Sequence, residues 1–205
     1  MAGRKTFLSA AVLALIAAGA SAPAIMDQFI QEKEGESLTA YQDGARVWTI
    51  CNGRTAGVTR STIMTKAECD AWRQTEIGRR LAFVHSVIKP EMSEPAWAGI
   101  ASWCLNVGDT GCAGSNAVSL INSGNQPAGC RAMLSWRFIT RSMTIAEASA
   151  FAARASNQAD VKKRIRLAQS LGKQRVDVKV DCSDEQPWCK GLWQRRQAEA
   201  EMCTL

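Results

Sequence analysis

Two carboxylates and a hydroxyl stand close together in the first quarter of the chain: Glu34, Asp43 and Thr49. One carboxylic acid can protonate the leaving oxygen of a glycosidic bond, while a second carboxylate and a hydroxyl can hold the attacking water. Each residue type alone is common at a helix end, in a turn or in a strand. The set of three, at offsets of nine and six residues, indicates cleavage of a glycosidic bond.

The first carboxylate is predicted to lie at a helix end. Residues 25–34 carry an apolar stripe with helical spacing, and Gly35 follows where a helix C-cap favours a positive φ. We therefore expect Glu34 to be the last helical residue. There the negative end of the helix dipole disfavours ionisation of the carboxyl group, which suits a proton donor.

A hairpin is predicted to carry the other two residues. The runs Tyr41–Asp43 and Val47–Ile50 are β-prone, and the pair Asp43-Gly44 between them is a hairpin signal. Such a hairpin folds Asp43 and Thr49 back over the end of the preceding helix.

Helices dominate the remaining pattern. Thr65 opens a capping box, and apolar residues spaced as in a helix follow it to Ile88. Ser93 is the expected N-cap of a further helix. Thr144 opens another capping box before an Ala-rich, basic stretch to about residue 171, and Val176–Val180 alternates like a short exposed strand.

Three blocks of motifs follow one another along the chain. They are Glu34-Gly35 with Tyr41-Gln42-Asp43 and Trp48-Thr49, then Trp103 to Gly108 with a glycine-rich stretch to Gly124, and last Gly191 to Glu199. In order and spacing these blocks, which bracket residues 30–203, resemble the phage-type lysozymes of glycoside hydrolase family 24. The resemblance implies an α+β, predominantly helical, lysozyme-like fold of two lobes: a small β-hairpin lobe, a long connecting helix and a helical C-terminal lobe.

The resemblance also implies an activity. It is hydrolysis of the β-1,4 bond between N-acetylmuramic acid and N-acetylglucosamine in peptidoglycan, by a phage or prophage endolysin that lyses its bacterial host. Glu34 would protonate the leaving oxygen, and Asp43 and Thr49 would position a water on the opposite face, giving inversion. Two alternatives stay open, a lytic transglycosylase that uses Glu34 alone and a non-catalytic wall-binding protein.

Further roles follow from the same resemblance. Tyr41, Asn106 and Gly108 match substrate-contacting positions, and Arg195 matches the position that contacts the catalytic Glu34. The family implies no cofactor, a monomer and a functional link to a holin. Two positions depart from the family pattern, since many members have Gly at the position of Cys51 and a His near that of Arg54.

The N-terminus predicts export. A short cationic start, Met1–Lys5, precedes 20 uncharged residues, Thr6–Ile25, which is the length of a membrane span but is rich in Ala. A cleavable signal peptide is one interpretation, with Ala22-Pro23-Ala24 as the open cleavage site. The other, from the resemblance, is a signal-anchor-release segment that tethers the enzyme to the inner membrane before release into the periplasm. The domains are then 1–25 and 26–205.

The cysteines agree with an exported chain. All eight follow the apolar span: Cys51, Cys69, Cys104, Cys112, Cys130, Cys182, Cys189 and Cys203. An even number in such a chain predicts a disulfide set, whereas the absence of a Cys-x-x-Cys motif and the single His argue against zinc. Proximity along the chain favours Cys104 with Cys112 and Cys182 with Cys189. The family pattern then favours Cys130 with Cys203, which leaves Cys51 with Cys69.

The net charge of +6 indicates an acidic partner. No basic run of nucleic-acid motif quality appears, whereas peptidoglycan carries carboxylates that fit the charge. The run Lys162 to Arg166 is either a solvated helix face or a patch that binds the wall or a membrane surface. It lies in residues 137–188, a stretch longer than the family usually has and to which the sequence assigns no role.

Overall fold

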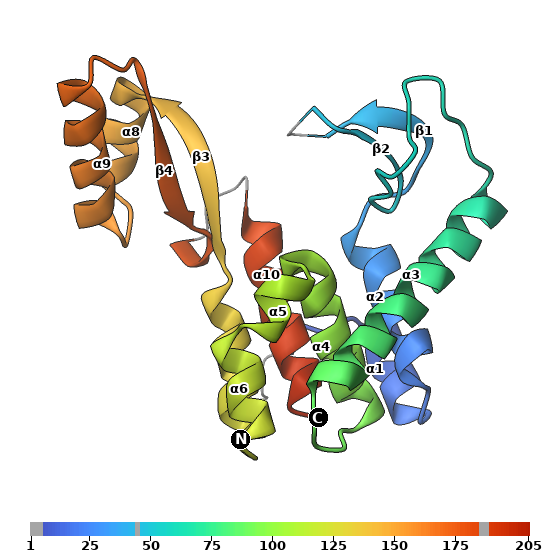
Figure 1. The fold of residues 1–205 in the computed structure, drawn as a ribbon. Helices are drawn as coiled ribbons and strands as arrows, with labels where there is room; N and C mark the ends of the chain where they lie inside the picture. Colours follow the sequence, from blue (N-terminus) through green and yellow to red (C-terminus); the bar gives the residue numbers. More distant parts are fainter. Residues whose placement is uncertain (1–5, 44–45, 185–188) are drawn as a thin grey trace. The chain divides into compact units, whose positions relative to one another are not determined.

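The structure is a computed structural model that describes residues 6–43, 46–184 and 189–205. Two compact units make up the chain (Figure 1). Residues 1–133 and 197–205 form the first unit, and Leu134–Arg196 form the second. The predicted class, α+β with helix predominant, is confirmed.

Helices build most of the first unit. They are α1 (Ala10–Ala17), α2 (Ala22–Lys33), α3 (Lys66–Val87), α4 (Glu94–Val107), α5 (Asp109–Ala113), α6 (Asn116–Asn122) and α7 (Gln126–Ala132), together with the end of α10 (Lys190–Cys203). A 3-10 turn, η1 (Met133–Ser135), follows α7. One apolar core joins these helices and includes Ile25, Phe29, Ile77 and Trp103.

The helix starts that the sequence predicts are confirmed. Thr65 and Glu68 form a reciprocal capping box at the start of α3, which runs unbroken to Val87. Ser93 caps α4 by accepting a hydrogen bond from the amide of Ala96, 3.3 Å away. These caps satisfy amide groups that have no partner within the helix, which is why they mark helix starts so reliably.

The apolar segment of residues 6–25 forms two helices and a corner. Ser9 caps α1 by accepting from the amide of Val12 at 3.1 Å, and Gly19, with φ of 70°, turns the chain before α2 begins. Leu8 and Val12 are buried in the core of the first unit. Among the described residues, no helix combines the length and the hydropathy that a membrane span requires.

The expected end of α2 was wrong by one residue. Lys33 is the last helical residue and Glu34 is the C-cap, with an extended backbone at φ −105° and ψ 129°. The amide of Glu34 still donates to the carbonyl of Ile30 at 2.8 Å, which closes the helix. Gly35 does not adopt the expected positive φ, because the chain passes directly from the cap into a strand and needs no left-handed turn.

The predicted hairpin follows. Strands β1 (Ser37–Gln42) and β2 (Trp48–Cys51) pair antiparallel, with Tyr41 opposite Thr49. Gly44, half of the Asp-Gly signal, lies outside the described residues, and so does Ala45. The disulfide between Cys51 and Cys69 joins the end of β2 to the first turn of α3.

The second unit is a small α/β layer. Strands β3 (Phe138–Thr144) and β4 (Arg175–Asp181) pair antiparallel, and between them lie α8 (Ile145–Ala152) and α9 (Gln158–Ser170). A 3-10 turn, η2 (Cys182–Asp184), follows β4 and leads towards the start of α10. The capping box at Thr144 is confirmed, but the stretch to residue 171 divides into two helices.

The alternating strand expected at residues 176–180 is present, but only one of its faces is exposed. Val176, Val178 and Val180 are buried beneath the helices of the second unit. At its end, Arg137 binds Asp181 at 2.8 Å. Burial raises the pKa of Asp181, but hydrogen bonds from Ser183 and Arg137 outweigh it and hold that pKa below its usual range.

Candidate active site

Thr49 lies on β2, close to the turn of the hairpin. Its side chain is buried, with 4% of its surface exposed, and its hydroxyl donates to the carbonyl of Val47 at 3.1 Å. The paired residue across the hairpin, Tyr41, is 43% exposed. The threonine oxygen therefore has a fixed position and lone pairs that can accept a hydrogen bond from a water.

Asp43 closes the hairpin turn. Its amide donates to the carbonyl of Val47 at 3.0 Å, and its Oδ1 accepts from the amide of Val47 at 2.9 Å. Its own carbonyl accepts from the amide of Arg46 at 2.9 Å. These bonds orient the carboxylate of Asp43, which is half-buried. An oriented carboxylate is what positioning a water requires.

Glu34 lies where α2 ends and the hairpin lobe begins. Its side chain is half-buried, so it can meet both protein and solvent. Two residues separate it from the first residue of β1, and the carbonyl of Gly35 accepts from the side chain of Asn52 at 3.4 Å. Glu34 thus lies at the junction between α2 and the hairpin.

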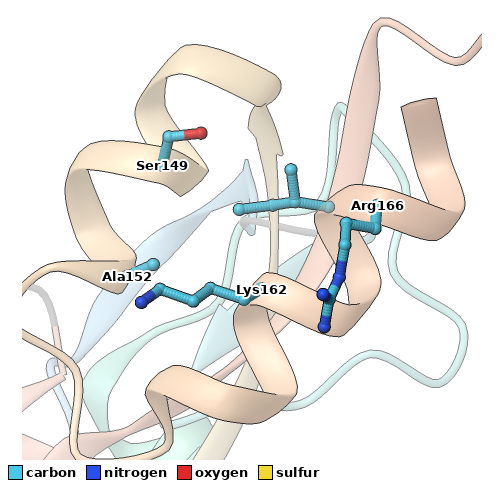
Figure 2. A pocket seen from close by; sticks show the side chains of 5 residues that line it. Ser149, Ala152, Lys162 and Arg166 are labelled. Carbon is cyan, nitrogen blue, oxygen red and sulfur yellow. The ribbon is translucent and has the colours of Figure 1, made fainter.

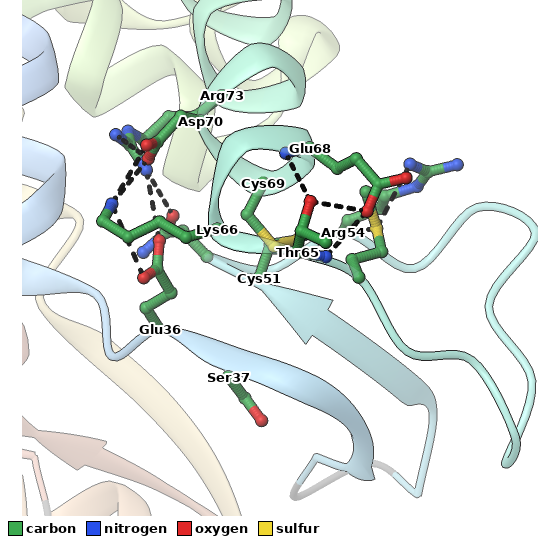
Figure 3. Close-up of a disulfide and its surroundings, with 12 residues drawn as sticks. Glu36, Ser37, Cys51, Arg54, Thr65, Lys66, Glu68, Cys69, Asp70 and Arg73 are labelled. Atoms are coloured by element: carbon green, nitrogen blue, oxygen red, sulfur yellow. Dashed lines mark hydrogen bonds and ion pairs between the residues drawn. A yellow bond between two sulfur atoms is a disulfide. The ribbon is translucent and has the colours of Figure 1, made fainter.

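A buried arginine connects the elements that carry these residues (Figure 3). Arg73 on α3 is 4% exposed and has carboxylate partners on α2, on α3 and in the connection before β1. Its Nε binds Asp27 of α2 at 2.7 Å and its Nη2 binds Asp70 of α3 at 2.8 Å. Its Nη1 binds Asn52 after β2 at 3.0 Å and Glu36 before β1 at 3.5 Å.

The charges in this cluster stabilise one another. Hydrogen bonds from Lys66 and Arg73 lower the pKa of Asp70. Burial lowers the pKa of Arg73, but its bonds with Asp27 and Asp70 outweigh burial and raise it. The guanidinium can serve several acceptors at once because it presents donors in a planar fork. Arg73 therefore joins α2, the hairpin and α3 to one another.

The backbone at Cys51 accounts for one departure from the family pattern. Cys51 has φ of 54°, in the left-handed region that glycine adopts most easily. A non-glycine residue there costs about 1 kcal/mol or more. The disulfide to Cys69 offsets this cost by joining positions 18 residues apart.

The other disulfides are Cys104–Cys112, Cys130–Cys203 and Cys182–Cys189. Together with Cys51–Cys69 they are the same four pairs set out from the sequence. Cys130–Cys203 joins the end of α7 to the end of α10, the longest of the four loops. Within the residues that the structure describes, no group of three or more His, Cys, Asp or Glu side chains is arranged for a metal ion.

The predicted substrate contacts on α4 lie at its end. Asn106 is exposed in the last turn, and Gly108 is the C-cap with φ of 81°. Beside them, the buried Arg80 of α3 pairs with Asp109 and, at 3.2 Å, with Glu76. Substrate contact by Tyr41, Asn106 and Gly108 stays a prediction.

Arg195 lies on α10 in the second unit and is buried. Its pairing with Glu34 stays a prediction. The sequence reasoning missed Arg73, although one signal was present: Asp70 and Arg73 are spaced i and i+3 on a helix, where side chains meet. Its partners at residues 27, 36 and 52 have no such local signal.

Comparison with known proteins agrees with these features. Residues 31–147 match the family model described as Phage lysozyme. A protein described as SAR-endolysin, from Escherichia phage 933W, is 48% identical over 134 residues, which are 63% of this chain and 76% of the relative.

Solved structures share the fold. The endolysin from Escherichia coli O157:H7 phage FAHEc1 matches with a TM-score of 0.60 at 21% identity, over 86% of this chain and 89% of that one. The active form of the P1 phage endolysin Lyz matches with a TM-score of 0.55 at 17% identity, over 98% of this chain and 96% of that one. The lysozyme-like fold is therefore confirmed.

Proposed function

Because the chain belongs to the phage lysozyme family, we propose that it is an endolysin that cleaves the β-1,4 bond between N-acetylmuramic acid and N-acetylglucosamine in the peptidoglycan of a bacterial host. Glu34 protonates the leaving oxygen. Asp43 and Thr49 hold the water that attacks from the opposite face of the sugar, so the anomeric configuration inverts.

One observation carries this proposal. The proton donor lies at a helix end and the two water-holding residues lie on one hairpin, and Arg73 binds the elements on both sides. Preorganisation of this kind lowers the barrier because no group has to be brought into place during the reaction. In an inverting enzyme the carboxyl groups of Glu34 and Asp43 stand roughly 6.5 to 9.5 Å apart to admit the water.

The test is digestion of purified peptidoglycan with the full chain and with Glu34→Gln and Asp43→Asn. We expect reducing muramic acid ends by mass spectrometry and loss of activity in both variants. Anhydro ends, with Asp43→Asn fully active, would instead identify a lytic transglycosylase. No cleavage by the unaltered chain would leave only a wall-binding role. A chemical assay of the first-formed anomer distinguishes inversion from retention.

The proposal extends to where the enzyme is held. Residues 6–25 serve as an uncleaved anchor in the inner membrane and later leave it, and the catalytic domain then works in the periplasm once a holin has acted. The packing of residues 6–25 supports the proposal that they are not cleaved from the chain. Leu8 and Val12 are buried, and the amide of Phe7 donates to Glu201 at 2.7 Å. Cleavage after Ala24 would remove these groups from the core.

Intact-mass measurement of the active, released enzyme tests this part separately. A chain that keeps residues 6–25, first in the membrane fraction and later soluble, is the expected result. A mature chain that begins at Ile25 would refute the anchor and leave the muramidase assignment untouched. Gel filtration of the same sample tests whether the enzyme is a monomer.

A further inference from the structure

The positive charge of the chain lies in the second unit. Residues 134–196 hold 13 Lys or Arg against 6 Asp or Glu, whereas the rest of the chain holds 12 against 13. The net charge of +6 therefore does not belong to the part that carries Glu34, Asp43 and Thr49. Charge separated in this way indicates an anionic partner for the second unit itself.

Helix α9 carries four of these cations within five residues: Lys162, Lys163, Arg164 and Arg166. Lys162 and Arg166 form one i, i+4 row, and Lys163 lies in the adjoining row; all three are exposed. Within the described part of the chain, no carboxylate lies within ion-pair distance of any of the three. Arg164, by contrast, is paired with Asp160 at 2.7 Å.

Two leucines continue the row that Lys163 begins. Leu167 is 59% exposed and Leu171 is 60% exposed, each four residues after the previous member of the row. These are among the most exposed large apolar side chains of the described residues. Exposed leucines beside unpaired cations form an amphipathic surface, which is typical of helices that lie at a membrane interface.

A pocket adjoins the cation row. It has a volume of about 270 Å³ and lies between α8 and α9, lined by Ser149, Ala152, Lys162, Ile165 and Arg166. Figure 2 shows Lys162 reaching towards Ala152 of α8, with Arg166 on the same helix as Lys162. The two cations can bind a phosphate, and the apolar side chains of Ala152 and Ile165 beside them can contact an apolar group attached to it.

We propose that the second unit binds the surface of an anionic phospholipid bilayer. Lys162 and Arg166 hold a lipid phosphate at the α8–α9 pocket, and Leu167 and Leu171 enter the boundary between headgroups and acyl chains. A membrane fits this surface better than a glycan strand does, because sugars are bound by hydrogen bonds and aromatic faces, whereas aliphatic side chains gain free energy from leaving water. The unit would keep the enzyme at the membrane face after residues 6–25 have left the bilayer.

The test uses the full chain and sedimentation with vesicles. One set contains phosphatidylglycerol mixed with phosphatidylcholine, and the other contains phosphatidylcholine alone. We expect Lys162→Gln/Arg166→Gln to weaken binding to the anionic vesicles about 30-fold, since each cation near such a surface contributes about a factor of five. Leu167→Ser/Leu171→Ser should weaken it about tenfold.

A charge-matched control separates a site from a general charge effect. Lys89→Gln/Arg131→Gln removes two exposed cations from the first unit and should change binding by less than about twofold. All variants keep residues 6–25, so any insertion of that segment contributes equally. Circular dichroism and peptidoglycan hydrolysis, which these substitutions should not alter, show that each variant is folded.

Three results would overturn the proposal. The first is anionic-vesicle binding that survives Lys162→Gln/Arg166→Gln. The second is an equal loss in the control, which would leave only net charge. The third is that Lys162→Gln/Arg166→Gln binds purified sacculi less tightly than the unaltered chain but binds vesicles equally well, which would identify a wall-binding site instead.

Discussion

Substitution of Arg73 tests whether the ion cluster positions the catalytic elements. Arg73→Met keeps a side chain of similar length and removes all the hydrogen bonds to Asp27, Glu36, Asn52 and Asp70. Helix α2, which precedes Glu34, and the hairpin would then lose their common partner. We expect both the stability and the turnover rate to fall.

The magnitude follows from how buried each partner is. Removing one member of a fully buried ion pair costs about 3 to 5 kcal/mol, because the remaining charge loses its compensation. Here Arg73 is 4% exposed, but its carboxylate partners Asp27, Glu36 and Asp70 are 21%, 27% and 37% exposed and can regain water. We therefore expect a loss of about 2 to 3 kcal/mol in the free energy of unfolding.

The assay combines urea unfolding with hydrolysis of purified peptidoglycan at a temperature where every variant is folded. Arg73→Met should lower kcat about tenfold or more with little change in KM, because misplaced catalytic groups affect the transition state most. Arg73→Lys should recover only part of both losses, since an ammonium lacks the planar fork. Full activity in folded Arg73→Met would refute a positioning role, and a loss that merely follows the unfolded fraction would show a structural role alone.

Three further outcomes follow from single features of the fold. Cys51→Gly/Cys69→Ser should be about 1 kcal/mol more stable than Cys51→Ser/Cys69→Ser in urea unfolding, because residue 51 has φ of 54°; equal stability would show that the backbone relaxes. Gly99→Val should destabilise the first unit by about 3 kcal/mol or more, since a Cβ there would lie 2.7 Å from the carbonyl oxygen of Glu199, and unchanged thermal unfolding would contradict this close packing. Asp181 has a lowered pKa in the folded chain, so its contribution to stability is present above about pH 4 and is lost as the pH falls further. Asp181→Asn should therefore lose less stability than the unaltered chain between about pH 5 and 3, and parallel pH profiles would rule out this linkage.

Much of the architecture was predictable from short-range chemistry. Thr65, Ser93 and Thr144 each mark the start of a helix in the sequence, because a capping side chain accepts a hydrogen bond from a backbone amide only two or three residues away. The hairpin that carries Asp43 and Thr49 was predictable for the same reason, since turn residues and alternating strands act on their neighbours. The error at Gly35 concerned how the chain leaves a helix, which depends on the element that follows.

Longer-range features needed the tertiary structure. The 20-residue apolar span had two interpretations, and its division at Gly19 between two helices depends on the core that receives Leu8 and Val12. The strand near Val178 looked exposed because alternation does not reveal what covers its apolar face. Burial is a property of partners distant in sequence, so local patterns cannot report it.

The sequence by itself predicted the chemistry and its local supports: a carboxylic acid at a helix end, a carboxylate and a hydroxyl on a hairpin, and the resemblance to the phage-type lysozymes. Only the tertiary structure decided how these parts are joined. Arg73 meets Asp27, Glu36 and Asn52 because burying a guanidinium is favourable only where several acceptors converge, and that convergence involves residues 21 to 46 positions away. Residue types suited to catalysis can be recognised along the chain, whereas the contacts that position them form only when the chain folds.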